Sequence, residues 1–362
     1  MKNKYFVFSS EISRSSGGIG NTTYYLIKSF VEYNCPTIGI VDRSPDLVSG
    51  ATIYETKEKS ILKRIIKGLI FYRHNNGNEG ISLCLSWRYA IVPFLCGGKY
   101  IVMTHGNDVE NVYRSSFRIR VENRLRNTIL NHAAKICANS MYTASLVKQI
   151  RIKDEPIIIH PCSGEIVDYY EKASDGKYIL SIGRLEERKG FQFVIEAFRK
   201  ISNIYNEYKY IIAGDGPYRH DLEKLITQYK LEKKCILKGR ISEDEKAKLL
   251  RNCTVLIMPS FYNKSVGSVE GFGIVFIEAN AHGKPVIGSR SGGIPDAIQD
   301  GKTGLLVDEK NVEQLEEAIQ SVLSGKIHFD DQYCKNWAEK HYYTEIAKQY
   351  LETIKLLIQN EN

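Results

Sequence analysis

The sequence of 362 residues lacks the patterns that mark a zinc site, a disulfide framework or a membrane span. Its eight cysteines are scattered, none is spaced as Cys-x-x-Cys, and most lie in apolar runs. This usage is typical of reduced core residues in a cytosolic protein. No apolar segment approaches the roughly 18 residues that cross a bilayer, and the apolar run after Lys4 is too short for a signal-peptide core. We therefore expect a cytoplasmic protein.

What is present is the composition of a soluble globular protein. Hydrophobic residues make up 43% of the chain and charged residues 25%, and the length suits two domains with separate cores. Positive charge is uneven. Residues 1–172 carry 23 Lys and Arg against 15 Asp and Glu, whereas residues 173–362 carry 27 of each. The net charge of +8 therefore belongs to the first half.

Short β-branched or aromatic segments alternate with segments of helical periodicity along the chain. In the first half, the predicted strands are Lys4–Ser9, Thr37–Val41, Ile81–Leu85, Tyr100–Thr104, Lys135–Ala138 and Pro156–His160. The predicted helices there are 22–33, Ser60–Arg73, Arg114–His132 and Met141–Ile150. A second series begins at Tyr178, after a polar segment, Ser163–Lys177, that reads as an interdomain linker, and it ends with a predicted helix at Trp337–Ile358. This alternation predicts an α/β protein with parallel, doubly wound sheets.

The stretch Val269–Asp308 holds the most informative pattern. It begins with the glycine-broken turn Glu-Gly-Phe-Gly, which leads into a predicted helix at Ile274–Ala281. A helix entered through Gly273 leaves its first amides, near Ile274 and Val275, without intrahelical partners. Such a helix end attracts an anion such as a phosphate group.

Two carboxylates flank this predicted anion site. Glu270 lies in the turn and Glu278 about two turns into the helix, so each can bind hydroxyl groups on one side of a phosphate. Hydroxyl-rich groups on both sides of a diphosphate describe a nucleotide sugar.

Glu270 and Glu278 within EGFGIVFIEA, followed by GKPVIGSRSGGIPDAI and DGKTGLLV, resemble the donor-site signature of the retaining family 4 glycosyltransferases of GT-B fold. The resemblance covers nearly the whole chain and is specific from Ser181 to Asp308. It implies two Rossmann-like domains, 1–165 and 166–335, that face an interdomain cleft. It also implies a C-terminal helix within 336–362 that crosses back to the first domain.

The loop Gly183–Gly190 is the second part of the predicted donor site. Arg184 offers a planar fork and Lys189 a point charge, which together suit a diphosphate. Surface charge alone also explains many Arg/Lys pairs, but the resembling family places Gly-Arg-Leu-x-x-x-Lys-Gly in front of its donor phosphates. Arg188 is ranked below both as a phosphate contact. Backbone groups at Arg240 and Ile241 end a predicted strand near the expected nucleobase position.

In the first half, Gly18 and Gly20 lie in a glycine loop after the first strand, and Asn21 is expected to cap the next helix. The loop lacks the full dinucleotide fingerprint and can be a mere tight turn. The resemblance implies that its amides approach the donor phosphates or the acceptor. His105 follows a strand and so stands at the carboxyl end of the sheet, where it is expected to contact the sugar or order the acceptor.

The loop His160–Gly164 stands where related chains often carry Asn-Gly-Val-Asp, so no role is assigned to it.

The resemblance implies sugar transfer with retention of configuration and without a bound metal or other cofactor. The sequence contains no Asp-x-Asp motif. Arg184, Lys189 and the amides at Gly273 and Ile274 would compensate the leaving diphosphate in place of a metal. Glu278 is assigned to the ribose hydroxyls and Glu270 to the donor sugar. A UDP-linked hexose or N-acetylhexosamine is favoured over a GDP sugar as donor.

Basic residues are also concentrated on two predicted helices of the first half. They are Lys57, Lys59, Lys63, Arg64, Lys67 and Arg73 around one helix, and Arg114, Arg118, Arg120, Arg124 and Arg126 on the other. These helices either expose ordinary solvated faces or dock on an anionic membrane surface. Nucleic acid is not expected, because aromatic residues are not interleaved with these clusters.

Membrane docking would favour a lipid-linked acceptor over a free glycan, as in bacterial O-antigen or capsule synthesis. The alternative functions are a nucleotide-sugar epimerase or phosphorylase of the same fold, and a non-catalytic sugar-binding partner.

Overall fold

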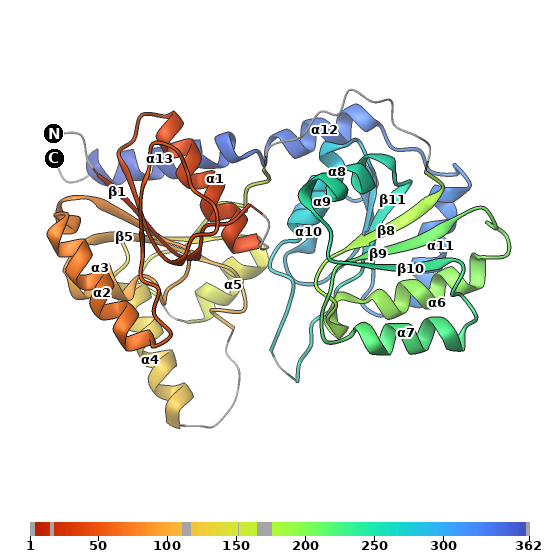
Figure 1. Cartoon of the computed structure of the whole chain (residues 1–362), viewed down its shortest axis with the longest axis horizontal. Coiled ribbons are helices and arrows are strands. Elements are labelled where there is room, and N and C mark those ends of the chain that lie inside the picture. The colour runs from red at the N-terminus through yellow and green to blue at the C-terminus, as the bar shows by residue number, and fades with distance from the viewer. Residues whose placement is uncertain are drawn as a thin grey trace. The chain divides into compact units, whose positions relative to one another are not determined.

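The computed structural model describes residues 4–14, 18–110, 117–150, 152–164, 176–265 and 267–359. The chain folds into two compact units, Met1–Gly164 with His341–Asn362, and Glu165–Lys340 (Figure 1). Most of the predicted linker Ser163–Lys177 lies outside the described residues, as do Gly17 and Arg114.

The first unit is built on a parallel sheet whose described strands number seven, in the order β3-β2-β1-β4-β5-β6-β7. The strands are β1 (Tyr5–Glu11), β2 (Thr37–Arg43), β3 (Thr52–Glu55), β4 (Ile81–Cys84), β5 (Lys99–Thr104), β6 (Lys135–Ala138) and β7 (Ile157–Ile158). The helices are α1 (Gly18–Glu32), α2 (Ile61–His74), the 3-10 turn η1 (Gly77–Glu79), α3 (Ile91–Leu95), α4 (Phe117–Asn131), α5 (Met141–Gln149) and α13 (Tyr343–Gln359).

Helices cover both faces of this sheet because successive strand residues point to opposite sides. Val7 packs with α1 and α13 on one face, where Tyr350 of α13 is fully buried. Phe6 and Phe8 pack on the other face, against Tyr72 of α2. The C-terminal helix α13 therefore completes the core of the first unit.

The second unit contains six described parallel strands in the order β10-β9-β8-β11-β12-β13. The strands are β8 (Tyr178–Ile182), β9 (Lys209–Ala213), β10 (Cys235–Gly239), β11 (Val255–Met258), β12 (Val286–Ser289) and β13 (Gly304–Val307). The helices are the 3-10 turn η2 (Glu187–Lys189), α6 (Phe191–Ile201), α7 (Arg219–Gln228), α8 (Glu243–Asn252), α9 (Ile274–Ala281), α10 (Ile294–Ala297), α11 (Val312–Leu323) and α12 (Asp331–Glu339).

This sheet is also buried on both faces. Ile179 packs with α6 and α11, whereas Leu180 packs with α8, α9 and α10 on the opposite face. Renumbered from β8, the strand order is 3-2-1-4-5-6, the arrangement of a doubly wound nucleotide-binding sheet. The α/β class and the parallel, doubly wound sheets predicted from the sequence are confirmed.

Two of the predicted helices need correction, and three short or polar elements were not predicted. Helix α1 begins at Gly18, so Asn21 lies inside its first turn instead of capping it, and Asn21 Nδ2 donates to the Arg14 carbonyl at 3.0 Å. The long helix predicted at Trp337–Ile358 is two helices, α12 and α13. The helical conformation is interrupted between them, where the Ser163 amide donates a hydrogen bond to the His341 carbonyl at 2.8 Å. Strand β3 and helices α3 and α7 were not predicted, because each is short or polar.

No disulfide links the eight cysteines, all of which the structure describes, and six of them are buried. Within the described ranges, no helix is long and apolar enough to cross a membrane.

The loops at the carboxyl edge of the second sheet are in close backbone contact, which gives a test of the fold. A Cβ at Gly214 would lie 1.9 Å from the Gly183 carbonyl oxygen, whereas a Cβ at Gly301, which also has positive φ, would meet no atom within 4 Å. We expect Gly301→Ala to lower the free energy of unfolding by about 1 kcal/mol. Gly214→Ala should cost a further ~1–3 kcal/mol from overpacking. Urea unfolding of both variants measures the difference, and equal losses would contradict the packing described.

Candidate functional site

The candidate site lies at the carboxyl edge of the second sheet, where its strand order reverses. Strands β8 and β11 are neighbours at this edge, and the connections that follow them lead away in opposite directions. Ligands of open α/β sheets bind in the crevice formed at such a point. The loop Gly183–Gly190 follows β8, and the segment that follows β11 ends at Gly273, where α9 begins.

Close backbone contacts hold these two loops together. The Phe261 amide donates to the Arg188 carbonyl at 2.8 Å. Gly190 has φ of +77°, and a Cβ there would lie 2.2 Å from the Pro259 carbonyl oxygen, so only glycine fits. The Gly293 amide donates to the Glu270 carbonyl at 2.9 Å and fixes the turn before α9. These contacts bring the side chains of the two loops close together in front of α9.

A cluster of charged side chains forms at this place. The Lys189 ammonium contacts Oε2 of Glu270, and Nη1 of Arg188 lies 3.4 Å from the same oxygen. The three side chains are only 12–16% exposed, so the pairing is stronger than that of a surface ion pair. Oε1 of Glu270 has no hydrogen-bond partner among the described residues. The carboxylate thus keeps one oxygen for a ligand.

The cations decide the protonation of Glu270. Burial alone would raise the pKa of Glu270, but the positive charges of Lys189 and Arg188 outweigh burial and hold the pKa below its ordinary value. The carboxylate is therefore ionised near neutral pH.

Helix α9 begins beside this carboxylate. Its N-cap, Gly273, has φ of +93°, and a Cβ at this position would lie 2.7 Å from the Phe276 ring and 3.8 Å from Cγ of Glu270. The Phe276 amide donates to the Gly273 carbonyl at 3.0 Å. Among the described parts of the chain, the amides of Ile274 and Val275 have no acceptor. The predicted helix start and its unpaired amides are confirmed.

Glu278 belongs to a second ion pair on the same helix. It is the fifth residue of α9, about one turn from its start and not two as expected. Its Oε1 lies 3.0 Å from Nζ of Lys246 on α8, which also lies 2.7 Å from Glu243. Burial alone would lower the pKa of Lys246, but Glu278 and Glu243 outweigh it and raise the pKa. Oε2 of Glu278 has no partner within the described chain, so this carboxylate too keeps one oxygen available.

Comparison with known proteins identifies this unit. A sequence model described as "Glycosyl transferases group 1" matches residues 164–342. The second unit belongs to the glycosyl transferases group 1 family. The match confirms the resemblance recognised in the sequence.

Several relatives match part of the chain. An uncharacterized glycosyltransferase of Methanocaldococcus jannaschii is 33% identical over 51% of this chain and 46% of its own. The GDP-mannose-dependent alpha-(1-6)-phosphatidylinositol monomannoside mannosyltransferase of Mycobacterium tuberculosis is 34% identical over 40% of this chain and 38% of its own. A Salmonella typhimurium protein named for colanic acid biosynthesis is 34% identical over 38% of this chain and 34% of its own. The chain thus matches less than half of the length of each of these relatives.

Two solved structures match nearly the whole chain. Sucrose-phosphate synthase from Thermosynechococcus elongatus has a TM-score of 0.81 at 17% identity, over 99% of this chain and 100% of that one. Anabaena HepE in complex with UDP-glucose has a TM-score of 0.76 at 17% identity, over 97% and 99% of the two chains. At this identity the likeness shows the fold, and the predicted GT-B fold is confirmed.

Within the group 1 domain, the remaining predicted residues are more exposed. The Arg184 side chain is 69% exposed and its Nε lies 3.2 Å from Glu186. The Arg240 side chain is 86% exposed, with its Nε 3.6 Å from Asp215, and Ile241 is partly buried. The contacts of Glu270 therefore come from Arg188, which the sequence ranked below Arg184, and from Lys189. Arg188 and Lys246 are the site residues that sequence reasoning undervalued or missed.

His105, Gly18 and Gly20 belong to the first unit. His105 follows β5, and its Nε2 lies 2.8 Å from the Leu85 carbonyl. A carbonyl only accepts, so Nε2 carries a proton and Nδ1 is the nitrogen left for another partner. Gly18 is the first residue of α1, and the carbonyl of the buried Gly20 accepts a hydrogen bond from the Ser13 amide at 3.2 Å. How these residues meet the group 1 domain remains a prediction.

The pairing of Glu270 predicts a pH-dependent stability. Because its folded pKa lies below the ordinary value of 4.5, its stabilisation is complete above pH 4.5 and is lost as the pH falls through the folded pKa. We expect the difference in unfolding free energy between wild type and Glu270→Gln to be constant above pH 4.5 and to shrink in more acid solution. Urea unfolding across this range measures it. Glu232→Gln, at an exposed position, is the control, and the same acid dependence there would contradict the assignment.

Proposed function

We propose that the protein is a retaining glycosyltransferase that moves a hexose or N-acetylhexosamine from a UDP sugar to a hydroxyl of a glycan or lipid-linked acceptor. The carrying observation is the cluster of Lys189, Arg188 and Glu270 beside the N-terminus of α9. Two cations and unpaired amides suit a diphosphate. A carboxylate with one unused oxygen suits the hydroxyls of the sugar attached to that diphosphate.

The donor would be held from both ends. Glu278 uses one oxygen for Lys246 and keeps the other for the ribose hydroxyls. Glu270 does the same with Lys189 and faces the transferred sugar. Anabaena HepE, which shares the fold, binds UDP-glucose, and this supports a UDP sugar over the GDP-mannose of the mycobacterial relative.

In the proposed reaction, an acceptor hydroxyl attacks the anomeric carbon on the face from which the diphosphate leaves. The new bond joins the acceptor oxygen to that carbon as the bond from carbon to phosphate oxygen breaks. The departing phosphate oxygen takes the proton of the hydroxyl. Arg184, Lys189 and the amides at Gly273 and Ile274 compensate the developing negative charge, which is why we propose that no metal or other cofactor is needed. His105 would contact the sugar or order the acceptor through Nδ1.

The acceptor is proposed from two relatives. The mycobacterial mannosyltransferase is named for a phosphatidylinositol monomannoside, and the Salmonella protein for colanic acid biosynthesis. A lipid-linked or glycan acceptor in bacterial surface polysaccharide synthesis, such as O-antigen or capsule, agrees with both names. We further propose that the enzyme acts in the cytoplasm at the inner face of the plasma membrane.

Arg184 offers a clean kinetic test because its exposed side chain supports little of the fold. We expect Arg184→Ala to lower turnover on the order of 10²- to 10³-fold, the scale of losing one charge-stabilising contact. The readout is UDP release with the lipid-linked saccharide that the wild type uses best. Arg199→Ala, on α6, should leave turnover near normal. Near-normal turnover of Arg184→Ala would remove this residue from the mechanism.

Nucleotide binding tests the donor before any acceptor is known. At about 100 times its dissociation constant, a ligand adds about 2.7 kcal/mol to stability. For a unit of this size, that raises the melting temperature by several degrees, at roughly 2–4 °C per kcal/mol. We expect UDP to produce this shift and GDP to produce less, and Glu278→Gln to weaken it. A larger shift with GDP would overturn the UDP assignment.

The same assays separate the alternative functions. Binding of UDP sugars without UDP release for any acceptor would indicate a non-catalytic partner. A changed sugar nucleotide without acceptor would indicate an epimerase.

A further inference from the structure

Helix α4 carries an apolar stripe that faces solvent. Phe117, Val121 and Leu125 recur every four residues, so they share one side of the helix, and their exposed fractions are 80%, 52% and 42%. The buried side of the same helix is formed by Arg126, Ile129 and Leu130. The stripe therefore has no function in the core of the first unit.

Helix α2 repeats this arrangement. Leu62, Ile66 and Ile70 also recur every four residues, with exposed fractions of 67%, 47% and 66%. Its buried residues are Gly68 and Tyr72. Two helices of one unit thus each present three large aliphatic or aromatic side chains to solvent, which is the kind of surface that marks an interaction site.

A cavity of about 340 Å³ joins the two helices. Ile61 and Ile65 of α2 line it on one side, and Arg118 and Leu125 of α4 on the other. Figure 1 shows α2 (orange), α3 and α4 (yellow) gathered at one end of the first unit. Both helices therefore border one cavity at this end of the first unit. We name the exposed sides of the two helices the α2–α4 face and define it by the two stripes together with Lys63, Lys67, Arg118, Arg120 and Arg124.

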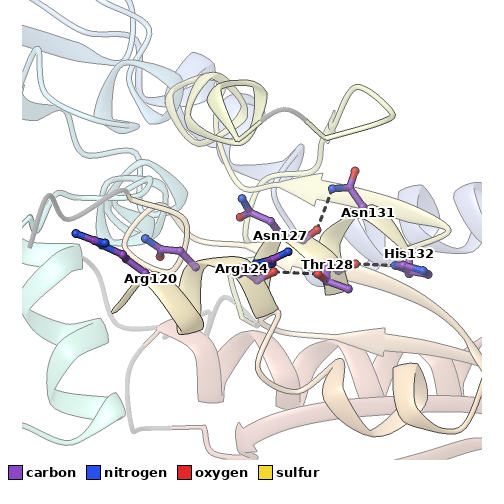
Figure 2. Close-up of a pocket in the computed structure, with 7 residues that line it drawn as sticks. Arg120, Arg124, Asn127, Thr128, Asn131 and His132 are labelled. Atoms are coloured by element: carbon purple, nitrogen blue, oxygen red, sulfur yellow. Dashed lines mark hydrogen bonds between the residues drawn. The ribbon is translucent and has the colours of Figure 1, made fainter. Parts of the chain in front are cut away.

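Cations border both stripes. Lys63 and Lys67 follow the apolar stripe on α2, and Arg118, Arg120 and Arg124 border the stripe on α4. Within the described ranges, the guanidinium groups of these three arginines form no ion pair with a carboxylate. Figure 2 shows Arg120 and Arg124 on the polar side of α4, in line with Asn127, Thr128, Asn131 and His132. Arg120 and Arg124 thus belong to the polar side of α4, whereas Arg118 lines the cavity shared with α2.

Charge decides which partner fits this face. A second copy of the chain would bring like charges together, which is unfavourable, whereas an anionic surface pairs with each exposed cation. An apolar stripe bordered by Lys and Arg is the pattern of a helix that lies in the plane of a membrane interface. We propose that the α2–α4 face docks on a bilayer that contains anionic lipid, with the apolar side chains inserted between the headgroups.

The test uses the full chain and vesicles of phosphatidylcholine with and without phosphatidylglycerol. We expect co-sedimentation with the mixed vesicles at low salt, weak binding at high salt, and little binding to phosphatidylcholine alone. The triple variant Arg118→Gln, Arg120→Gln, Arg124→Gln should bind the mixed vesicles on the order of 100-fold more weakly. The double variant Phe117→Ser, Val121→Ser should also lose binding to the mixed vesicles, because the cations alone cannot insert between the lipid headgroups.

Two control variants test whether the losses are specific to the α2–α4 face. Lys224→Gln, Lys233→Gln and Lys326→Gln remove three exposed charges from the second unit, and Leu47→Ser with Ile204→Ser removes two exposed apolar side chains elsewhere. Both controls should bind like wild type. Binding indifferent to phosphatidylglycerol, or equal losses in variants and controls, would overturn the proposal. Self-association in sedimentation velocity that Phe117→Ser with Val121→Ser abolishes, without vesicle binding, would assign the face to a second copy instead.

Discussion

The partly buried carboxylate of Glu270 is the group on which the candidate site depends. It compensates Lys189 and Arg188 at a point where the fold removes all three from most solvent. Without the Glu270 carboxylate, the two partly buried cations would repel each other, and only an anionic ligand could compensate their charge. The carboxylate therefore compensates both cations and still offers one oxygen to a ligand. A diphosphate would take over part of this compensation when it binds.

A second carboxylate paired with a cation lies about one turn further along α9. Glu278 and Lys246 pair across α8 and α9, again with one carboxylate oxygen left over. Both carboxylates are thus oriented by a cation, which limits the freedom that a sugar or ribose would otherwise have to remove on binding. Between them lies the start of α9, whose glycine N-cap keeps side chains away from the amides. Positive charge at the centre and oriented carboxylates at both ends would complement the nucleotide sugar that we propose as donor.

The first unit has a different physical character. Buried hydrophobic clusters pack on both faces of its sheet, as in the second unit, and residues of α13 belong to one of these clusters. Its surface, however, combines Arg118, Arg120 and Arg124 of α4, which form no ion pair with a carboxylate of the described chain, with exposed apolar side chains on α2 and α4. The sequence showed the charge, but it showed the apolar residues only as ordinary periodic positions. Burial separates them: Tyr72 of α2 lies in the core, whereas Leu62, Ile66 and Ile70 of the same helix do not.

The sequence by itself determined the class of fold, most elements and the start of α9, because local periodicity and glycine positions are short-range properties. It also predicted, through a motif, that Glu270, Glu278, Arg184 and Lys189 bind the donor. Only the tertiary structure decided that Arg188 and not Arg184 contacts Glu270, and that Lys246 pairs with Glu278. Those contacts join residues 82 and 32 positions apart. No local pattern reports such a pairing, because it depends on which strands become neighbours in the sheet.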